Sequence, residues 1–129
     1  MLAPTKSFIY TSQTLPPSCN DTYKVNYRTK KIYVTPKAHQ FRSIMREHWI
    51  QQKIKPFVGD VSIVIKMCSK NKHVRDLDNT FKPVLDAMQK GGVFPNDSQV
   101  CRILGTKCRC QKCPFRFTCT VKDLEVVFL

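Results

Sequence analysis

Residues 57 to 67, FVGDVSIVIKM, predict a strand at the centre of a sheet. Apolar side chains alternate there, with Val61, Ile63, Ile65 and Met67 on one face, and several of them are β-branched. The strand leads directly into the string RDLDNTFKPVLDAMQKGGVFPNDSQV, residues 75 to 100. A predicted central strand therefore runs into a segment rich in charged residues.

Two helices are predicted beside the central strand. The first follows Thr35, an N-cap residue, with Pro36 at the first helical position. Its apolar side chains recur every three or four residues, which is typical of a helix packed on a sheet: Ala38, Phe41, Ile44, Met45 and Trp49. The second begins near Thr80, requires Pro83 in its first turn, and ends at the glycines of residues 91 and 92.

Shorter strands complete the predicted fold. Residues 7 to 10 and 31 to 34 are β-prone, residues 15 to 24 form a loop, and the region after Asp97 alternates well enough to form a hairpin that ends in LEVVFL. The predicted fold class is α+β (mixed α/β). We expect one small domain over residues 1–129, with a sheet of about four to five strands packed by two helices.

The charge distribution points to nucleic acid. The formal net charge is +13, yet residues 76 to 97 carry −2 from four aspartates and two lysines, so the remainder carries +15. A basic surface attracts phosphate, whereas the acidic island repels it unless a cation neutralises the carboxylates. The pattern therefore favours a divalent cation held where a polyanion binds.

The sequence also indicates the compartment. There is no apolar run long enough to span a membrane and no apolar segment after a basic start, so we expect neither a membrane protein nor a secreted one. Seven cysteines, an odd number, argue against a complete disulfide framework. We expect the reducing cytoplasm.

The island contains a candidate metal site. Asp76 and Asp78 are two residues apart, so in an extended segment both carboxylates point the same way. A helix that returns the chain is expected to bring Asp97 to the same cation, as in Mg²⁺ hydrolase sites. Lys82 can pair with Asp86 four residues later and is placed to touch a scissile phosphate. The alternative is that these residues have structural roles only, as helix caps, ion-pair partners and turn residues.

The order of the residues adds a resemblance. The string resembles the motif of the RusA-type Holliday junction resolvases, endodeoxyribonucleases that nick four-way DNA junctions. The matching positions are Arg75, Asp76, Asp78, Asn79, Lys82, Asp86, Asp97, Ser98, Gln99 and Val100. The likeness extends to the family's amino-terminal motif at Pro16, Pro17, Ser18, Asn20 and Tyr23. One departure is Asn96, where the family has an acid, and it puts metal affinity in doubt more than activity.

The resemblance implies a homodimer with Mg²⁺ or Mn²⁺ in two acidic sites, which resolves branched DNA by paired symmetric nicks in a bacterial or phage-infected cell. Asp76, Asp78 and Asp97 would hold the metal, metal-activated water would hydrolyse the phosphodiester, and Lys82 would contact the phosphate. The candidate DNA contacts are Arg75, Lys72, Lys70, Asn20 and Lys107. The alternative function is a catalytically impaired protein that binds branched DNA on the same fold.

The cysteines near the carboxyl terminus form a second candidate site. Cys108, Cys110, Cys113 and Cys119 have the spacing C-x-C-x2-C-x5-C, which lacks the paired C-x2-C motifs of common zinc sites. Reduced thiols in a hairpin are the favoured interpretation, and a Zn²⁺ site that stabilises an interaction module is the alternative.

Overall fold

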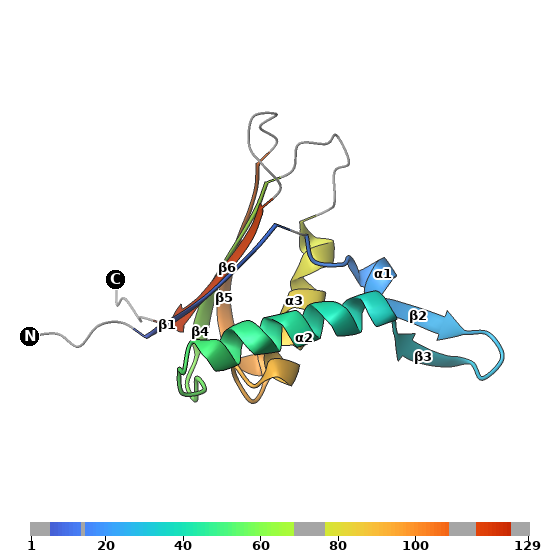
Figure 1. Cartoon of the computed structure of the whole chain (residues 1–129), viewed down its shortest axis with the longest axis horizontal. Helices are drawn as coiled ribbons and strands as arrows, with labels where there is room; N and C mark the ends of the chain where they lie inside the picture. Colours follow the sequence, from blue (N-terminus) through green and yellow to red (C-terminus); the bar gives the residue numbers. More distant parts are fainter. Residues whose placement is uncertain (1–5, 14, 69–76, 109–115, 125–129) are drawn as a thin grey trace, which may run out of the picture.

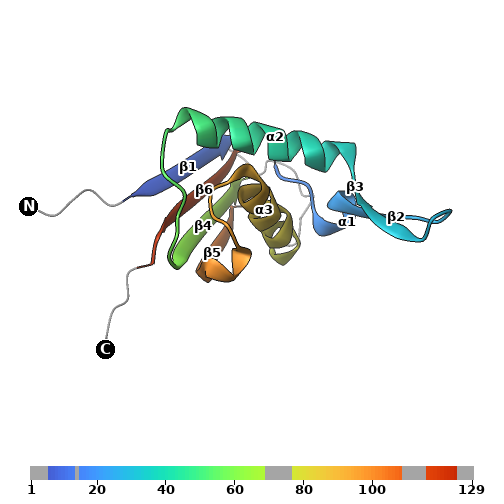
Figure 2. The ribbon, with the colours of Figure 1, turned by 90° about the horizontal axis from the view of Figure 1, so that it is seen from below.

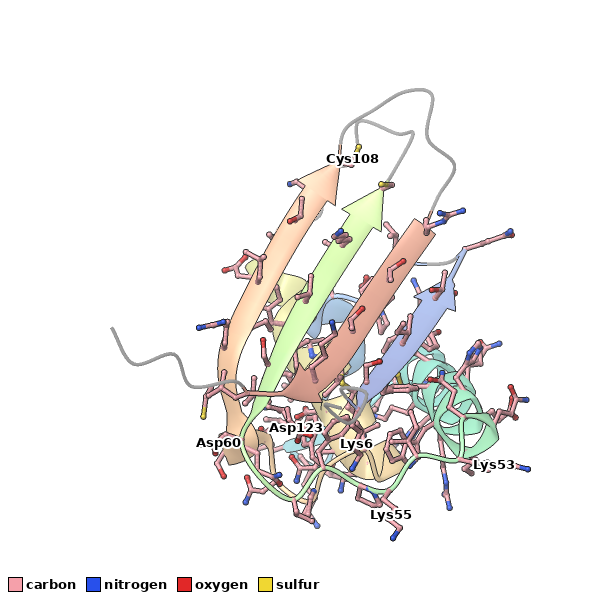
Figure 3. The ribbon with its side chains drawn as sticks, turned by 90° about the vertical axis from the view of Figure 1, so that its left-hand side faces the viewer. Lys6, Lys53, Lys55, Asp60, Cys108 and Asp123 are labelled. Carbon is pink, nitrogen blue, oxygen red and sulfur yellow. The ribbon has the colours of Figure 1, made fainter. Side chains whose placement is uncertain are left out.

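The structure, a computed structural model, describes residues 6–13, 15–68, 77–108 and 116–124. Its main sheet has four strands: β1 (Ser7–Ser12), β4 (Val61–Cys68), β5 (Val100–Cys108) and β6 (Arg116–Asp123). They lie in the order β1-β6-β4-β5, with β4 parallel to β5 and the other neighbours antiparallel (the sheet is edge-on in Figure 1 and face-on in Figure 3). The prediction of a central strand within residues 57 to 67 is therefore confirmed, because β4 has a neighbour on each side.

The pairing of the last two strands differs from the prediction. The two strands do not form a hairpin, because β6 lies between β1 and β4, whereas β5 pairs with the other side of β4. Alternation along the sequence identifies a strand but does not identify its neighbour. The residues of LEVVFL after Leu124 lie outside the described residues.

Helices α2 (Pro36–Gln51) and α3 (Asp78–Gly91) cover one face of the sheet (Figure 2). Thr35 caps α2, because its hydroxyl accepts a hydrogen bond from the Ala38 amide at 3.3 Å. The core between helices and sheet includes fully buried side chains from every layer, among them Phe8, Met45, Ile63, Ile65, Val84, Met88, Phe117 and Val121. The predicted fold class, with a four-stranded sheet and two main helices, is confirmed.

Helix α3 connects the parallel strands β4 and β5. It ends at Gly92, whose φ of 95° is the left-handed conformation that glycine tolerates. Its first turn lies close to β5, because a Cβ on Gly105 would meet Phe81 Cζ at 2.7 Å and Leu77 Cδ2 at 2.9 Å. Pro83 lies in the second turn, not the first as expected, and is buried. Gly105 thus fixes how closely the start of α3 approaches the sheet.

Smaller elements lie beside the helices. The region predicted as a loop contains the short helix α1 (Cys19–Thr22), where the Ser18 hydroxyl accepts from the Asp21 amide at 3.2 Å. Strands β2 (Tyr23–Asn26) and β3 (Lys31–Val34) form a separate antiparallel hairpin, and the 3-10 helix η1 (Asp97–Gln99) precedes β5. Within the described ranges, no helix is both long enough and apolar enough to cross a membrane.

Candidate active site on helix α3

One face of α3 carries the charged residues that the sequence singled out. Asp78, Lys82 and Asp86 are four residues apart, so they follow one another along the same side of the helix. Asp78 and Lys82 are exposed, whereas Asp86 is half-buried. Among the described residues, the Asp78 carboxylate has neither a hydrogen-bond nor an ion-pair partner, and Leu77, not Asp78, is the N-cap residue. Asp78 is therefore not the helix cap that the structural alternative supposed.

Asp86 is held by groups from three elements. Lys82 Nζ lies 3.6 Å from Oδ2 of Asp86, and Arg42 Nη2 of α2 lies 3.9 Å from the same oxygen. The hydroxyl of Tyr23, at the start of β2, donates a hydrogen bond to this oxygen as well. The expected pairing of Lys82 with Asp86 is confirmed, and the structure adds Tyr23 and Arg42 as partners that sequence spacing does not reveal.

The electrostatics of Asp86 follow from its burial. Burial raises the pKa of the Asp86 carboxyl, the negative charge of Asp97 raises it further, and Lys90 opposes the shift. Lys82 is exposed over 64% of its side chain, so water screens its charge. Its ammonium also lies 5.6 Å from the centre of the Tyr23 ring. Asp86 and Tyr23 thus position Lys82 while its ammonium stays accessible.

Asp97 begins η1, beyond the other end of α3. Its amide donates to Gln89 Oε1 of α3 at 3.2 Å. Asn96 caps η1, because its side-chain oxygen accepts from the Ser98 amide at 2.9 Å while Gln99 Oε1 accepts from the Asn96 amide at 3.1 Å. Asparagine and aspartate cap helices about equally well. The departure from the family pattern at Asn96 therefore preserves a cap, and the Asp97 carboxylate remains exposed beside it.

The structure separates Asp78 from Asp97. Gln89, which contacts Asp97, is 11 residues after Asp78 on α3. A rise of about 1.5 Å per residue places the Cα atoms of Asp78 and Gln89 about 16 Å apart along the helix. The expectation that a returning helix brings Asp97 beside Asp78 is not met within one chain. The physical reason is the parallel pairing of β4 and β5, because α3 must carry the chain back to the edge where both strands begin.

Several predicted site residues are outside the described part of the chain: Asp76, Arg75, Lys72 and Lys70. Within the described part, no three His, Cys, Asp or Glu side chains come together as a metal site. Exposed carboxylates suit Mg²⁺ chemically, but the described donors of one chain do not complete a site. Of the other candidate DNA contacts, Asn20 is exposed on α1, and Lys107 lies two residues beyond Gly105 on β5, near the start of α3.

Comparison with known proteins settles the family. The family model described as Endodeoxyribonuclease RusA matches residues 15–121. The chain belongs to the RusA endodeoxyribonuclease family. Membership implies endodeoxyribonuclease activity on Holliday junction DNA, as the string of residues 75 to 100 predicted. No individual curated protein matches the chain.

Another basic feature of this RusA chain lies between α2 and α3. A groove there is lined by His39, Arg42, Ser43, Arg46, Lys90 and Gly91. Three of these residues are cationic and none is acidic, so the groove is suited to a phosphate group of a DNA backbone. Sequence reasoning missed it, because the groove exists only where the two helices pack together.

The proposed cysteine cluster is not assembled from the described cysteines of this RusA chain. Cys119 is fully buried on the helix-covered face of β6, whereas Cys108, at the end of β5 (Figure 3), pairs with Cys68 on the other face. Burial also raises the pKa of the Cys119 thiol, which disfavours the thiolate that zinc requires. A site formed by the four predicted cysteines therefore loses Cys119, while Cys110 and Cys113 lie outside the described residues.

Proposed function

We propose that this chain is a Mg²⁺-dependent endodeoxyribonuclease that works as a homodimer and resolves Holliday junctions by paired symmetric nicks, with Mn²⁺ as a substitute cation. The supporting observation is the match of residues 15–121 to the RusA family, a range that contains the α3 face bearing Asp78 and Lys82. The formal net charge of +13 supports a polyanionic substrate.

The candidate site residues have distinct roles in this proposal. Asp78 offers an exposed carboxylate at the start of α3, and Asp76 and Asp97 complete the proposed metal ligands. Lys82 binds the scissile phosphate, while Asp86 and Tyr23 hold its side chain in place. When bound, Mg²⁺ polarises the phosphoryl oxygen and lowers the pKa of a bound water molecule.

The separation of Asp78 from Asp97 supports the homodimer. Asp78 lies about 16 Å along α3 from Gln89, the residue that contacts Asp97, and Mg²⁺ binds its ligands at about 2.1 Å. This separation disfavours one ion shared by Asp78 and Asp97 of the same chain. We therefore propose that each site takes Asp78 from one chain and Asp97 from its partner. A two-fold dimer then has two equivalent sites, which suits the near two-fold symmetry of a four-way junction.

The function is tested with a four-way junction labelled on each strand in turn. Mg²⁺ or Mn²⁺ should give nicks at symmetric positions on two opposed strands, and EDTA should abolish them. Asp76→Asn should also abolish nicking, and persistent nicking in that variant contradicts our assignment. Binding without nicking in either metal supports the alternative, a branched-DNA-binding protein without activity.

A further inference from the structure

The β2–β3 hairpin, residues 23 to 34, projects from the body of the molecule as an arm (Figures 1 and 2). Every residue from Lys24 to Tyr33 is exposed. A two-stranded hairpin without a packed face is marginally stable in water. An arm of this kind calls for a partner surface that it contacts.

The tip of the arm has a defined turn. Asn26 Oδ1 accepts hydrogen bonds from the amides of Arg28 at 3.0 Å and Thr29 at 3.3 Å. The Lys30 amide donates to the Asn26 carbonyl at 2.6 Å, and Lys30 takes a φ of 59°. This turn presents Tyr27 with 90% of its surface exposed. The turn therefore places Tyr27 at the end of the arm, where its side chain is available to a ligand.

The charge of the arm selects its partner. It carries Lys24, Arg28, Lys30 and Lys31 and has no acidic residue from Tyr23 to Val34. Val25 and Ile32 pair on one face, and Lys24 and Tyr33 pair on the other. Contact between the arms of two copies of this chain would bring like charges together and is therefore disfavoured. A polyanion complements the arm better.

The dimensions of the arm fit a DNA groove. Tyr27 follows Tyr23 by four positions, so the arm extends about 13 Å at about 3.3 Å per residue. The major groove is about 12 Å wide and about 8.5 Å deep, and it admits a two-stranded ribbon. At the base of the arm, the Tyr23 hydroxyl donates to Asp86, which also contacts Lys82. The arm is thus anchored beside the proposed cleavage residues.

We propose that the β2–β3 arm enters a groove of the DNA beside the cleavage position and that Tyr27 at its tip reaches the branch point, where it stacks on an exposed base. The choice of DNA as the partner rests on the proposed function. The role of the arm is nevertheless one of binding, so it is measurable without cleavage.

The test compares two double charge reversals in EDTA, with binding of a fluorescent four-way junction followed by anisotropy over a range of salt concentrations. R28E/K30E alters the arm, and K53E/K55E makes the same change of charge beyond the far end of α2, where both lysines are exposed (Figure 3). We expect R28E/K30E to weaken binding at least tenfold more than K53E/K55E and to lower the salt slope more. Equal losses overturn the proposal.

Two tyrosine variants test stacking. Tyr27→Ala should weaken binding by about five- to 150-fold, the range for loss of one stacked base, whereas Tyr27→Phe should bind like the parent. If neither variant loses affinity for the junction, the proposed role of Tyr27 is overturned. Circular dichroism and urea unfolding verify that each variant is folded.

Two further measurements separate the explanations. Sedimentation velocity reports the oligomeric state, and a change of state in R28E/K30E with unchanged DNA affinity assigns the arm to a protein contact and overturns the proposal. If the parent protein binds the junction through the arm yet does not nick it in Mg²⁺ or Mn²⁺, the proposed nuclease function is overturned and the DNA-binding role of the arm is supported. If the parent nicks the junction and no arm variant alters binding, the proposed role of the arm is overturned, whereas the nuclease function stands.

Discussion

The hydroxyl of Tyr23 donates a hydrogen bond to Oδ2 of Asp86 across 63 positions of the chain. Tyr23 starts β2 and Asp86 lies in the middle of α3, so this bond joins the base of the hairpin arm to the helix that bears Lys82. Few other described groups fix the hairpin to the body of the molecule. The Tyr23–Asp86 hydrogen bond therefore contributes both to stability and to the placement of Lys82.

Tyr23→Phe is expected to lower the free energy of unfolding by about 1 to 2 kcal/mol, because a half-buried carboxylate loses a hydrogen-bond donor. Urea unfolding at neutral pH measures the change. Tyr27→Phe is the control, since the Tyr27 side chain is exposed at the tip and makes no such bond. Equal stability of the two variants contradicts the prediction.

The raised pKa of Asp86 predicts a pH dependence of stability. Because burial raises the pKa in the folded chain above the ordinary carboxyl value, folding takes up a proton between the two values. The contribution of Asp86 to stability is complete below the ordinary pKa and is lost as the pH rises through the raised one. The free energy of unfolding of the parent minus that of Asp86→Asn should therefore fall as the pH rises from the ordinary carboxyl pKa of about 4 through the raised pKa of Asp86. A difference that grows with pH contradicts the assignment.

Lys82→Ala should slow single-turnover nicking by about 100- to 1,000-fold, the cost of removing one positioned donor to developing charge. Its effect on stability should be small, because the Lys82 side chain is 64% exposed. Lys53→Ala is the control, because Lys53 is exposed beyond the far end of α2, and this variant should retain nicking. Similar rates in the two variants would remove Lys82 from the site.

The shared site is tested by mixing two inactive variants. Asp78→Asn and Asp97→Asn should each abolish nicking alone. After unfolding and refolding together, half of the dimers are mixed and each mixed dimer has one intact site, so about a quarter of the parent's sites should return. The recovered activity should nick one strand of a junction at a time. No recovery despite verified mixed dimers contradicts a site shared between chains.

Gly105→Ala should destabilise the fold by about 1 to 3 kcal/mol, because the new Cβ would overlap Phe81 and Leu77 at the first turn of α3. Gly59→Ala is the control, since nothing lies within 4 Å of a Cβ built there. Thermal or urea unfolding distinguishes them, and equal stability of the two variants would refute the close contact.

Local patterns predicted much of the fold. Alternation identified β4, the Thr35-Pro36 pair identified the start of α2, and the glycines after residue 90 identified the end of α3. The predictions failed where the answer depended on pairing between distant segments. The insertion of β6 between β1 and β4 is one example, and the displacement of Asp97 from Asp78 by the length of α3 is another.

The candidate site was predictable to a different extent. Spacing alone gave the Lys82–Asp86 pair, since both residues lie on one helix. It could not give Tyr23 or Arg42, which reach Asp86 from other elements. Spacing also could not predict that Asn96 caps η1, because a lone asparagine in a turn has many local hydrogen-bonding options.

The order of strands in the main sheet has a consequence for synthesis. During synthesis, β6 leaves the ribosome after β1, β4 and β5, and it is the strand that joins β1 to β4. Until β6 emerges, β4, α3 and β5 can assemble as a local unit, but β1 lacks the strand with which it pairs. Such delayed pairing is typical of a topology rich in contacts between distant segments. A chain that stops before residue 116 should therefore leave an open sheet edge on β4 and expose it to aggregation or proteolysis.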